Sequence, residues 1–138
     1  MKKFQVITLF PEILDGFFNT SMMWKASKDC LAEFSTINLR EFGIGPRRTV
    51  DNTVYGGDGM LLMIEPLLAA LEYAKSKTPQ AKVILMSPSE TVWSQAMALE
   101  YSQSSDNYIL ICGRYEGVDA RIENFIDAKI SIGKYVLT

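Results

Sequence analysis

The chain has 138 residues, a length that fits one domain with a hydrophobic core of its own. Its formal net charge of −2 disfavours a generic polyanion binder, because phosphate neutralisation needs clustered lysine and arginine. Histidine is absent, which excludes Ser-His and Cys-His nucleophile pairs, and no apolar run approaches the roughly 20 residues of a membrane span. We therefore expect an untargeted, cytoplasmic protein without a membrane segment.

The first half of the chain predicts strands over residues 4–9 and 34–39 and helices over residues 11–18 and 21–31. Met22, Met23 and Trp24 crowd one face of the second helix, and we expect them to belong to the core. The stretch "LREFGIGPRRTVDNTVYGGDGM" follows, with five glycines and too little periodicity for a helix. A loop of this length in a compact domain is usually functional.

The second half predicts alternating helices and apolar strands. Strands are expected over residues 82–86, 107–112 and 128–133, and helices over residues 66–74, from Ser87 or Ser89 to Met97, and over 118–126. This alternation is typical of an α/β fold, a parallel sheet with helices on both faces. Ligands bind at the carboxyl ends of such strands, so the loops that begin after residues 86, 112 and 132 should converge on one site.

The loop "GRYEG" at residues 113–117 is the first candidate for that site. Its two glycines let the backbone approach a ligand on either side of a cation, an aromatic ring and an anion. Taken alone, the same residues equally suit a simple strand-to-helix turn with surface side chains. The motifs G-x-G-x-x-G after the first strand and G-x-x-x-x-G-K-[ST] are both missing, which disfavours the ordinary dinucleotide fold and the P-loop.

Several motifs then occur in an order known from one enzyme family: "FPE", "RRTVDN" leading into "YGGDGM", "EPL", "LMSP", "CGRYEGVDARI" and "SIGKYVLT". Through them the sequence resembles the bacterial tRNA (guanine-N1)-methyltransferase family of the SPOUT class, over nearly all 138 residues. The resemblance implies a SPOUT-type fold with a trefoil knot, S-adenosylmethionine as cofactor, and methyl transfer to N1 of the guanine 3′-adjacent to a tRNA anticodon. It also implies a homodimer whose subunits complete each other's sites, and it suggests Mg²⁺ as a further requirement.

The resemblance also implies roles for individual residues. The cofactor-binding positions are Leu85, Met86, Ser87, Pro88, Gly113, Tyr115, Ile132, Gly133, Lys134, Tyr135, Val136 and Leu137. The catalytic positions are Glu116, Asp51 and Arg114, with Glu116 near the methionine moiety and the target guanine. Arg47, Arg48 and Tyr55 are expected to contact the tRNA substrate. No set of metal ligands is recognisable.

The implied reaction makes its own demands on the site. A sulfonium methyl group is already electrophilic, so the site mainly has to hold it in line with the nucleophile. N1 of guanine carries a proton at neutral pH, so a carboxylate base or a group that stabilises charge on O6 is required. In the family the favoured base is an aspartate downstream of the knot, which would lie beyond Thr138.

The sequence departs from the family pattern in three ways. Lys134 stands where the family has aspartate, the "YGGDGM" loop is one residue short, and the chain stops at Thr138 within the last motif. We therefore expect residues 1–138 to be the cofactor-binding domain of a longer protein, with an incomplete knot, without the C-terminal tRNA-binding domain and inactive alone. The alternative is a non-catalytic ligand- or RNA-binding module with the same fold.

Overall fold

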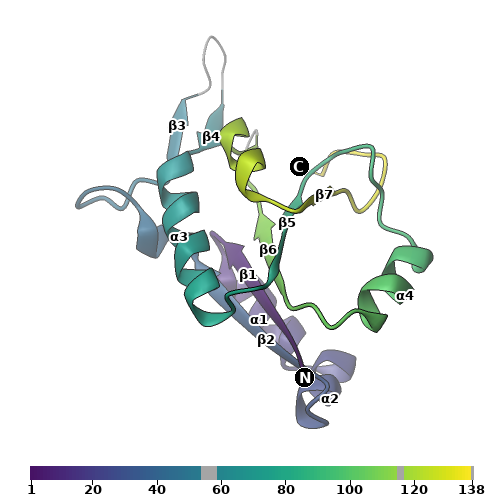
Figure 1. Ribbon diagram of the computed structural model, residues 1–138. Coiled ribbons are helices and arrows are strands. Elements are labelled where there is room, and N and C mark those ends of the chain that lie inside the picture. Colours follow the sequence, from purple (N-terminus) through teal and green to yellow (C-terminus); the bar gives the residue numbers. More distant parts are fainter. Residues whose placement is uncertain (54–58, 115–116, 138) are drawn as a thin grey trace.

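Figure 1 shows the computed structural model, in which residues 1–53, 59–114 and 117–137 are described. Its strands are β1 (Lys2–Thr8), β2 (Ala32–Asn38), β3 (Asp51–Thr53), β4 (Met60–Leu62), β5 (Lys82–Met86), β6 (Tyr108–Cys112) and β7 (Ala128–Ile130). Its α-helices are α1 (Pro11–Phe18), α2 (Ser21–Lys28), α3 (Ile64–Lys77) and α4 (Gln95–Gln103), and its 3₁₀ helices are η1 (Leu39–Phe42) and η2 (Ala120–Phe125). Within the described ranges, no helix is long and apolar enough to cross a membrane.

A five-stranded sheet with the order β2-β1-β6-β5-β7 forms the centre of the molecule. All four strand pairings in this sheet are parallel, and β3 and β4 form a separate antiparallel hairpin. Parallel neighbours need long crossover connections, which the helices supply. The predicted α/β class with a parallel sheet is therefore confirmed.

One face of the sheet is covered by α3 and η2 (Figure 1). Helix α3 buries Pro66 and five residues that recur at helical spacing, namely Ile64, Leu67, Ala70, Leu71 and Ala74. They pack with Ile7, Ile109 and other strand residues into the larger of two hydrophobic clusters, to which η2 adds Ile122. We call this side of the sheet the α3 face.

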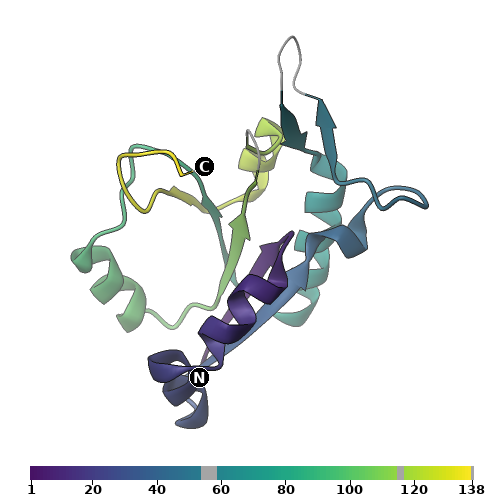
Figure 2. The ribbon, with the colours of Figure 1, turned by 180° about the vertical axis from the view of Figure 1, so that it is seen from behind.

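The other face carries α1, α2 and α4, and we call it the α1 face (Figure 2). Phe18 of α1 stacks on Phe34 at 5.2 Å between ring centroids, and Phe34 stacks on Phe4 at 5.5 Å. Tyr101 of α4 stacks on Tyr108 at 5.1 Å. The prediction of helices on both faces is therefore confirmed, although none of these three helices contributes a buried residue.

The predicted start of the helix after β5 is wrong. Helix α4 begins at Gln95, and its N-cap is Ser94, whose side chain accepts a hydrogen bond from the Met97 amide. Neither Ser87 nor Ser89 caps it, because the chain between β5 and α4 pairs with the end of β7 instead.

The prediction of a helix over residues 118–126 and a strand over 128–133 also needs correction. Val118 forms a parallel bridge with Leu62, so the helix covers Ala120–Phe125 and is a 3₁₀ helix. The final strand ends at Ile130. At Val118, pairing with a distant segment shortens the element that the local pattern favours.

Two further expectations fail in the first half of the chain. The glycine-rich stretch is more than a loop, since it contains η1 and β3 and ends at the first residue of β4. Two of the three residues of α2 that we expected in the core are exposed, Met22 at 72% and Trp24 at 48%, and Met23 is half-buried. A crowded apolar face indicates which residues point the same way, but another element must cover that face before it becomes core.

Candidate functional site

The carboxyl ends of β5, β6 and β7 lie next to one another. Met86, the last residue of β5, pairs with Cys112 at the end of β6 and with Ile130 at the end of β7. The Ser87 amide donates a hydrogen bond to the Ile130 carbonyl at 3.1 Å, and the Trp93 amide donates to the Ser131 carbonyl at 2.8 Å. The predicted convergence of the three loops at one edge is therefore confirmed.

The candidate cofactor residues at the end of β5 and in the loop that follows it differ in how exposed they are. We call this loop, residues 87–94, the β5 loop. Leu85 is 2% exposed and its side chain belongs to the larger hydrophobic cluster, so only its backbone could serve a ligand. Met86 and Ser87 are half-buried, and Pro88 is exposed. This loop therefore offers mainly backbone groups and a partly apolar wall.

The segment after β7 exposes most of its apolar side chains, which are Ile132, Tyr135, Val136 and Leu137. Gly133 is buried beneath the Tyr135 ring, and a Cβ added at Gly133 would lie 2.1 Å from a carbon of that ring. Lys134 is exposed, so its charge is solvated rather than enclosed in the edge. Apolar side chains beside accessible backbone groups are what a purine ring requires.

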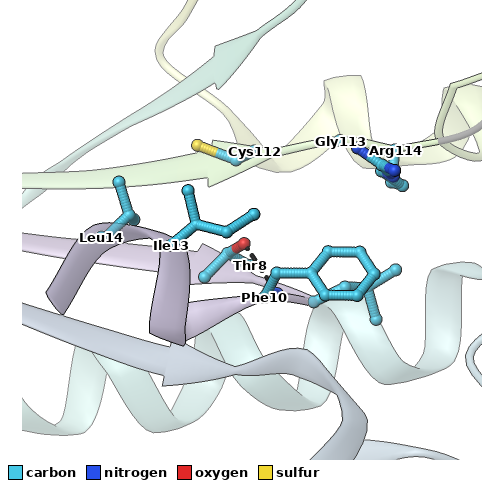
Figure 3. Close-up of a pocket in the computed structure, with 8 residues that line it drawn as sticks. Thr8, Phe10, Ile13, Leu14, Cys112, Gly113 and Arg114 are labelled. Carbon is cyan, nitrogen blue, oxygen red and sulfur yellow. Dashed lines mark hydrogen bonds between the residues drawn. The ribbon is translucent and has the colours of Figure 1, made fainter. Parts of the chain in front are cut away.

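The "GRYEG" loop is described at its two ends only, and the candidates Tyr115 and Glu116 lie outside the described residues. Gly117 has φ +130°, a conformation that L side chains rarely adopt, so this position requires glycine. Arg114 places its guanidinium 5.1 Å from the centroid of the Phe10 ring (Figure 3). This cation–π contact joins the "FPE" motif to the "GRYEG" motif.

A cavity of about 150 Å³ opens on the α1 face beside this contact (Figure 3). It is lined by Thr8, Leu9, Phe10, Ile13, Leu14, Cys112, Gly113 and Arg114. Burial raises the pKa of the Cys112 thiol. Ligand pockets typically measure about 300 Å³ or more, so this cavity by itself is small for a nucleoside cofactor. Sequence reasoning missed it, although "FPE" and "GR" follow strands that are paired neighbours.

Asp51 is half-buried in the hairpin of β3 and β4, where it pairs with Leu62. The Leu62 amide donates to the Gly117 carbonyl at 3.0 Å, and the Asp119 amide donates to the Leu62 carbonyl at 2.9 Å. The chain just after "GRYEG" is thereby joined to the hairpin that carries Asp51. Tyr55, another candidate for the tRNA substrate, lies outside the described residues.

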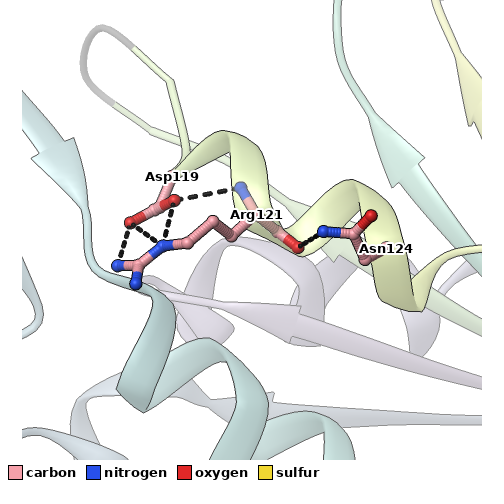
Figure 4. A network of polar contacts seen from close by, with 3 residues as sticks. All are labelled: Asp119, Arg121 and Asn124. Carbon is pink, nitrogen blue, oxygen red and sulfur yellow. Dashed lines mark hydrogen bonds and ion pairs between the residues drawn. The ribbon is translucent and has the colours of Figure 1, made fainter.

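An ion pair follows the motif directly (Figure 4). Arg121 donates from Nη2 to Asp119 Oδ2 at 2.7 Å and from Nε to Oδ1 at 3.1 Å, while its amide also donates to Oδ1. The side-chain hydrogen bonds from Arg121 hold the pKa of Asp119 below its ordinary value. The sequence signal for this pair was an Asp at the N-cap with an Arg two residues later, which we did not single out.

Arg47 and Arg48 are exposed on a turn closed by the pairing of Ile44 with Thr49. Gly43 is required under this turn, because an added Cβ would lie 2.2 Å from the Arg48 carbonyl group. The turn therefore presents two cations to solvent.

In the part of the chain that the structure describes, no three His, Cys, Asp or Glu residues form a group that could hold a metal ion. The Mg²⁺ requirement stays a prediction.

Comparisons with known proteins agree with this architecture. The model of the family described as tRNA (Guanine-1)-methyltransferase TrmD matches residues 1–138. A tRNA (guanine-N(1)-)-methyltransferase of Spiroplasma kunkelii is 42% identical over 100% of this chain and 51% of its own length, and one of Myxococcus xanthus is 41% identical over 97% and 55%. The chain thus spans about half the length of the curated relatives it matches.

A solved structure supports the same assignment. The crystal structure of tRNA (m1G37) methyltransferase from Aquifex aeolicus has a TM-score of 0.88 and 34% sequence identity to this chain, and it covers 99% of this chain and 62% of its own. The family and the SPOUT-type fold expected from the motifs are confirmed, while the knot stays a prediction. The chain belongs to the tRNA (guanine-1)-methyltransferase family.

Proposed function

We propose that the full-length protein containing this chain transfers a methyl group from S-adenosylmethionine to N1 of the guanine 3′-adjacent to a tRNA anticodon. The observation that carries this proposal is the family match over the whole of residues 1–138. The joined loops at the carboxyl ends of β5 and β7 support it, because ligands of open parallel sheets bind at that edge.

The cofactor would lie between the β5 loop and the segment after β7. Backbone groups of residues 85–88 and 132–137 would bind the adenosine, and the exposed side chains of Ile132, Val136 and Leu137 would shield its rings from water. Gly113 would approach it from the end of β6. When bound, the cofactor supplies an already activated methyl group, so the chain's task at this edge is orientation.

The tRNA would bind on the side of the β3–β4 hairpin. Asp51 would act on the target guanine together with Arg114. Tyr115 and Glu116 would complete this side of the site. Arg47, Arg48 and Tyr55 would contact the tRNA, the two arginines as phosphate contacts that fix its register. The hydrogen bonds of Leu62 support this grouping, because they join the hairpin to the end of the "GRYEG" loop.

The same proposal includes a homodimer. Helices α1 and α2 expose large apolar side chains, among them Ile13 at 68%, Phe17 at 57% and Met22 at 72%. Apolar side chains exposed on neighbouring elements are characteristic of surfaces that a partner covers. A second copy of the chain would cover them in the full-length protein.

The experiment uses the full-length protein, methyl-labelled S-adenosylmethionine and two tRNA transcripts that differ only in guanine or adenine next to the anticodon. We expect label in the guanine transcript alone, with a primer-extension stop at the modified base because N1 methylation blocks pairing. Cofactor binding without any transfer would instead support the non-catalytic module. Transfer to the adenine transcript would contradict the assigned target.

A variant tests the role of Asp51 in this reaction. Asp51→Asn removes the charge but keeps the shape. We expect kcat/KM to fall by about 100-fold, because a polar group placed against the reacting guanine stabilises the transition state even when another residue is the base. Glu100→Gln is the matched control, since it makes the same change of carboxylate to amide at an exposed position on α4. Equal activities of the two variants would show that Asp51 has no part in the chemistry.

A further inference from the structure

Ser131 stands out among the residues of the cofactor edge. It follows β7 directly and is 4% exposed, whereas the next side chain, Ile132, is 55% exposed. A buried hydroxyl needs hydrogen-bond partners, because an unpaired one costs free energy. The partners of this hydroxyl therefore indicate what the residue does.

The hydroxyl of Ser131 bonds to one residue in both directions. Its Oγ donates to the carbonyl of Gly133 and accepts from the amide of Gly133 at 3.2 Å. A hydroxyl has one proton to donate, so this arrangement uses the donor of Ser131 within the chain. Ser131 thereby fixes the amide and the carbonyl of Gly133, and with them the turn that follows β7.

The backbone of Ser131 is held from the opposite side. Its amide donates to the Thr91 carbonyl at 2.8 Å, and its carbonyl accepts from the Trp93 amide at 2.8 Å. Ser131 is thus anchored to the β5 loop through its backbone, and it anchors the segment after β7 through its side chain. The Tyr135 ring, which lies against Gly133, packs on the turn that results.

We infer that Ser131 is a positioning residue, whose hydroxyl holds the turn at Gly133 so that the neighbouring backbone groups of residues 132–137 are ready for the adenine end of the cofactor. The inference rests on the proposed function, since it names which part of the same site is prepared in advance. A turn that is ordered before binding lowers the entropy cost of association. Without the hydroxyl, the segment must order itself when the cofactor binds.

The test compares three variants of the full-length protein, Ser131→Ala, Ser131→Thr and Ser102→Ala, by calorimetry with S-adenosylmethionine, with adenosine and with tRNA. Loss of the hydroxyl in Ser131→Ala should weaken S-adenosylmethionine and adenosine by the same factor, about 3- to 10-fold, a loss typical of one or two hydrogen bonds. Ser131→Thr keeps the hydroxyl on an extended backbone and should restore the affinity. Ser102, exposed on α4, is the matched control and should leave it unchanged.

Affinity for tRNA should stay the same in all three variants. A defect that disrupts the fold would instead weaken the binding of every ligand. If the wild-type protein binds S-adenosylmethionine and Ser131→Ala binds it as tightly, the inference is wrong and the proposed function stands. If the wild-type protein binds neither S-adenosylmethionine nor adenosine, both proposals are wrong.

Hydrogen exchange in the free protein gives a second readout that needs no ligand. The Gly133 amide should be protected in wild type and in Ser131→Thr, and it should exchange faster in Ser131→Ala. An unprotected Gly133 amide in wild type would overturn the inference, even if the alanine variant does not fold.

Discussion

The two faces of the central sheet are built differently. On the α3 face a 14-residue helix buries six of its residues against the strands. On the α1 face three helices of eight or nine residues bury none, and the contact relies on stacked aromatic rings such as Phe18 on Phe34. The α3 face therefore holds the main core, and the α1 face keeps apolar side chains at the surface.

This difference shows what an apolar pattern does and does not predict. Both α2 and α3 carry large apolar residues, yet Trp24 is 48% exposed and Leu67 is 0% exposed. Periodicity determines which side chains point together, and the position of other elements determines whether water is excluded. The stability of the fold should therefore depend on one face far more than on the other.

The largest expected effect comes from the same substitution on the two faces. Leu67→Ala on the α3 face should lower the free energy of unfolding by about 2–5 kcal/mol, because it leaves a cavity in a buried cluster. Leu99→Ala on α4, where the side chain is 56% exposed, should change it by less than about 0.5 kcal/mol. Urea unfolding of the full-length variants, followed by circular dichroism, measures both. Similar losses would show that the two faces are equally packed.

A smaller effect is expected from the buried glutamine on the α3 face. Gln5 is 6% exposed, and its Nε2 donates to the Ala74 carbonyl at 2.8 Å and to Thr78 Oγ1 at 2.6 Å. Gln5→Ala should lower the free energy of unfolding by about 1–3 kcal/mol, since buried partners lose their hydrogen bonds. The exposed Gln103 on α4 gives the control variant Gln103→Ala. If the two variants unfold at the same urea concentration, the polar contact to α3 contributes nothing.

The smallest effect concerns reactivity rather than stability and tests how open the α1 face is. Cys30 is exposed, whereas Cys112 lines the cavity of Figure 3 and burial raises its pKa. A raised pKa leaves less thiolate at a given pH, so a thiol reagent at pH 8 should modify Cys30 first and Cys112 several-fold more slowly. Mass spectrometry over time measures both rates. Equal rates would mean that α1 does not shield the end of β6.

Much of the fold could be predicted from the sequence. The apolar strands over residues 82–86 and 107–112 and the helix over 11–18 lie where their patterns indicated, and the parallel sheet followed from their alternation. Two of the errors occur where a distant segment competes for backbone hydrogen bonds. The chain before α4 pairs with Ser131 instead of forming a helix, and Val118 pairs with Leu62 instead of beginning one.

The candidate site was predicted less completely. The motifs indicated the loops after β5, β6 and β7, and the structure brings the first and last of these into direct hydrogen bonding. They gave no sign of the part played by Ser131, because its hydrogen bonds to Gly133 depend on a turn that is not visible in the residue types. The contact of Arg114 with Phe10 was equally invisible, since it joins residues from two different strand ends.

The sequence by itself determined the family and the fold class, and it indicated the edge of the sheet where we propose the site. These depend on local patterns and on the order of motifs, which the chain carries in one dimension. Only the tertiary structure decided that Leu62 lies between Asp51 and Val118 and that one face of the sheet holds most of the buried core. Such features arise from packing and backbone pairing between distant segments. The free energy of these contacts depends on which segments the fold brings together, and a local pattern does not contain that information.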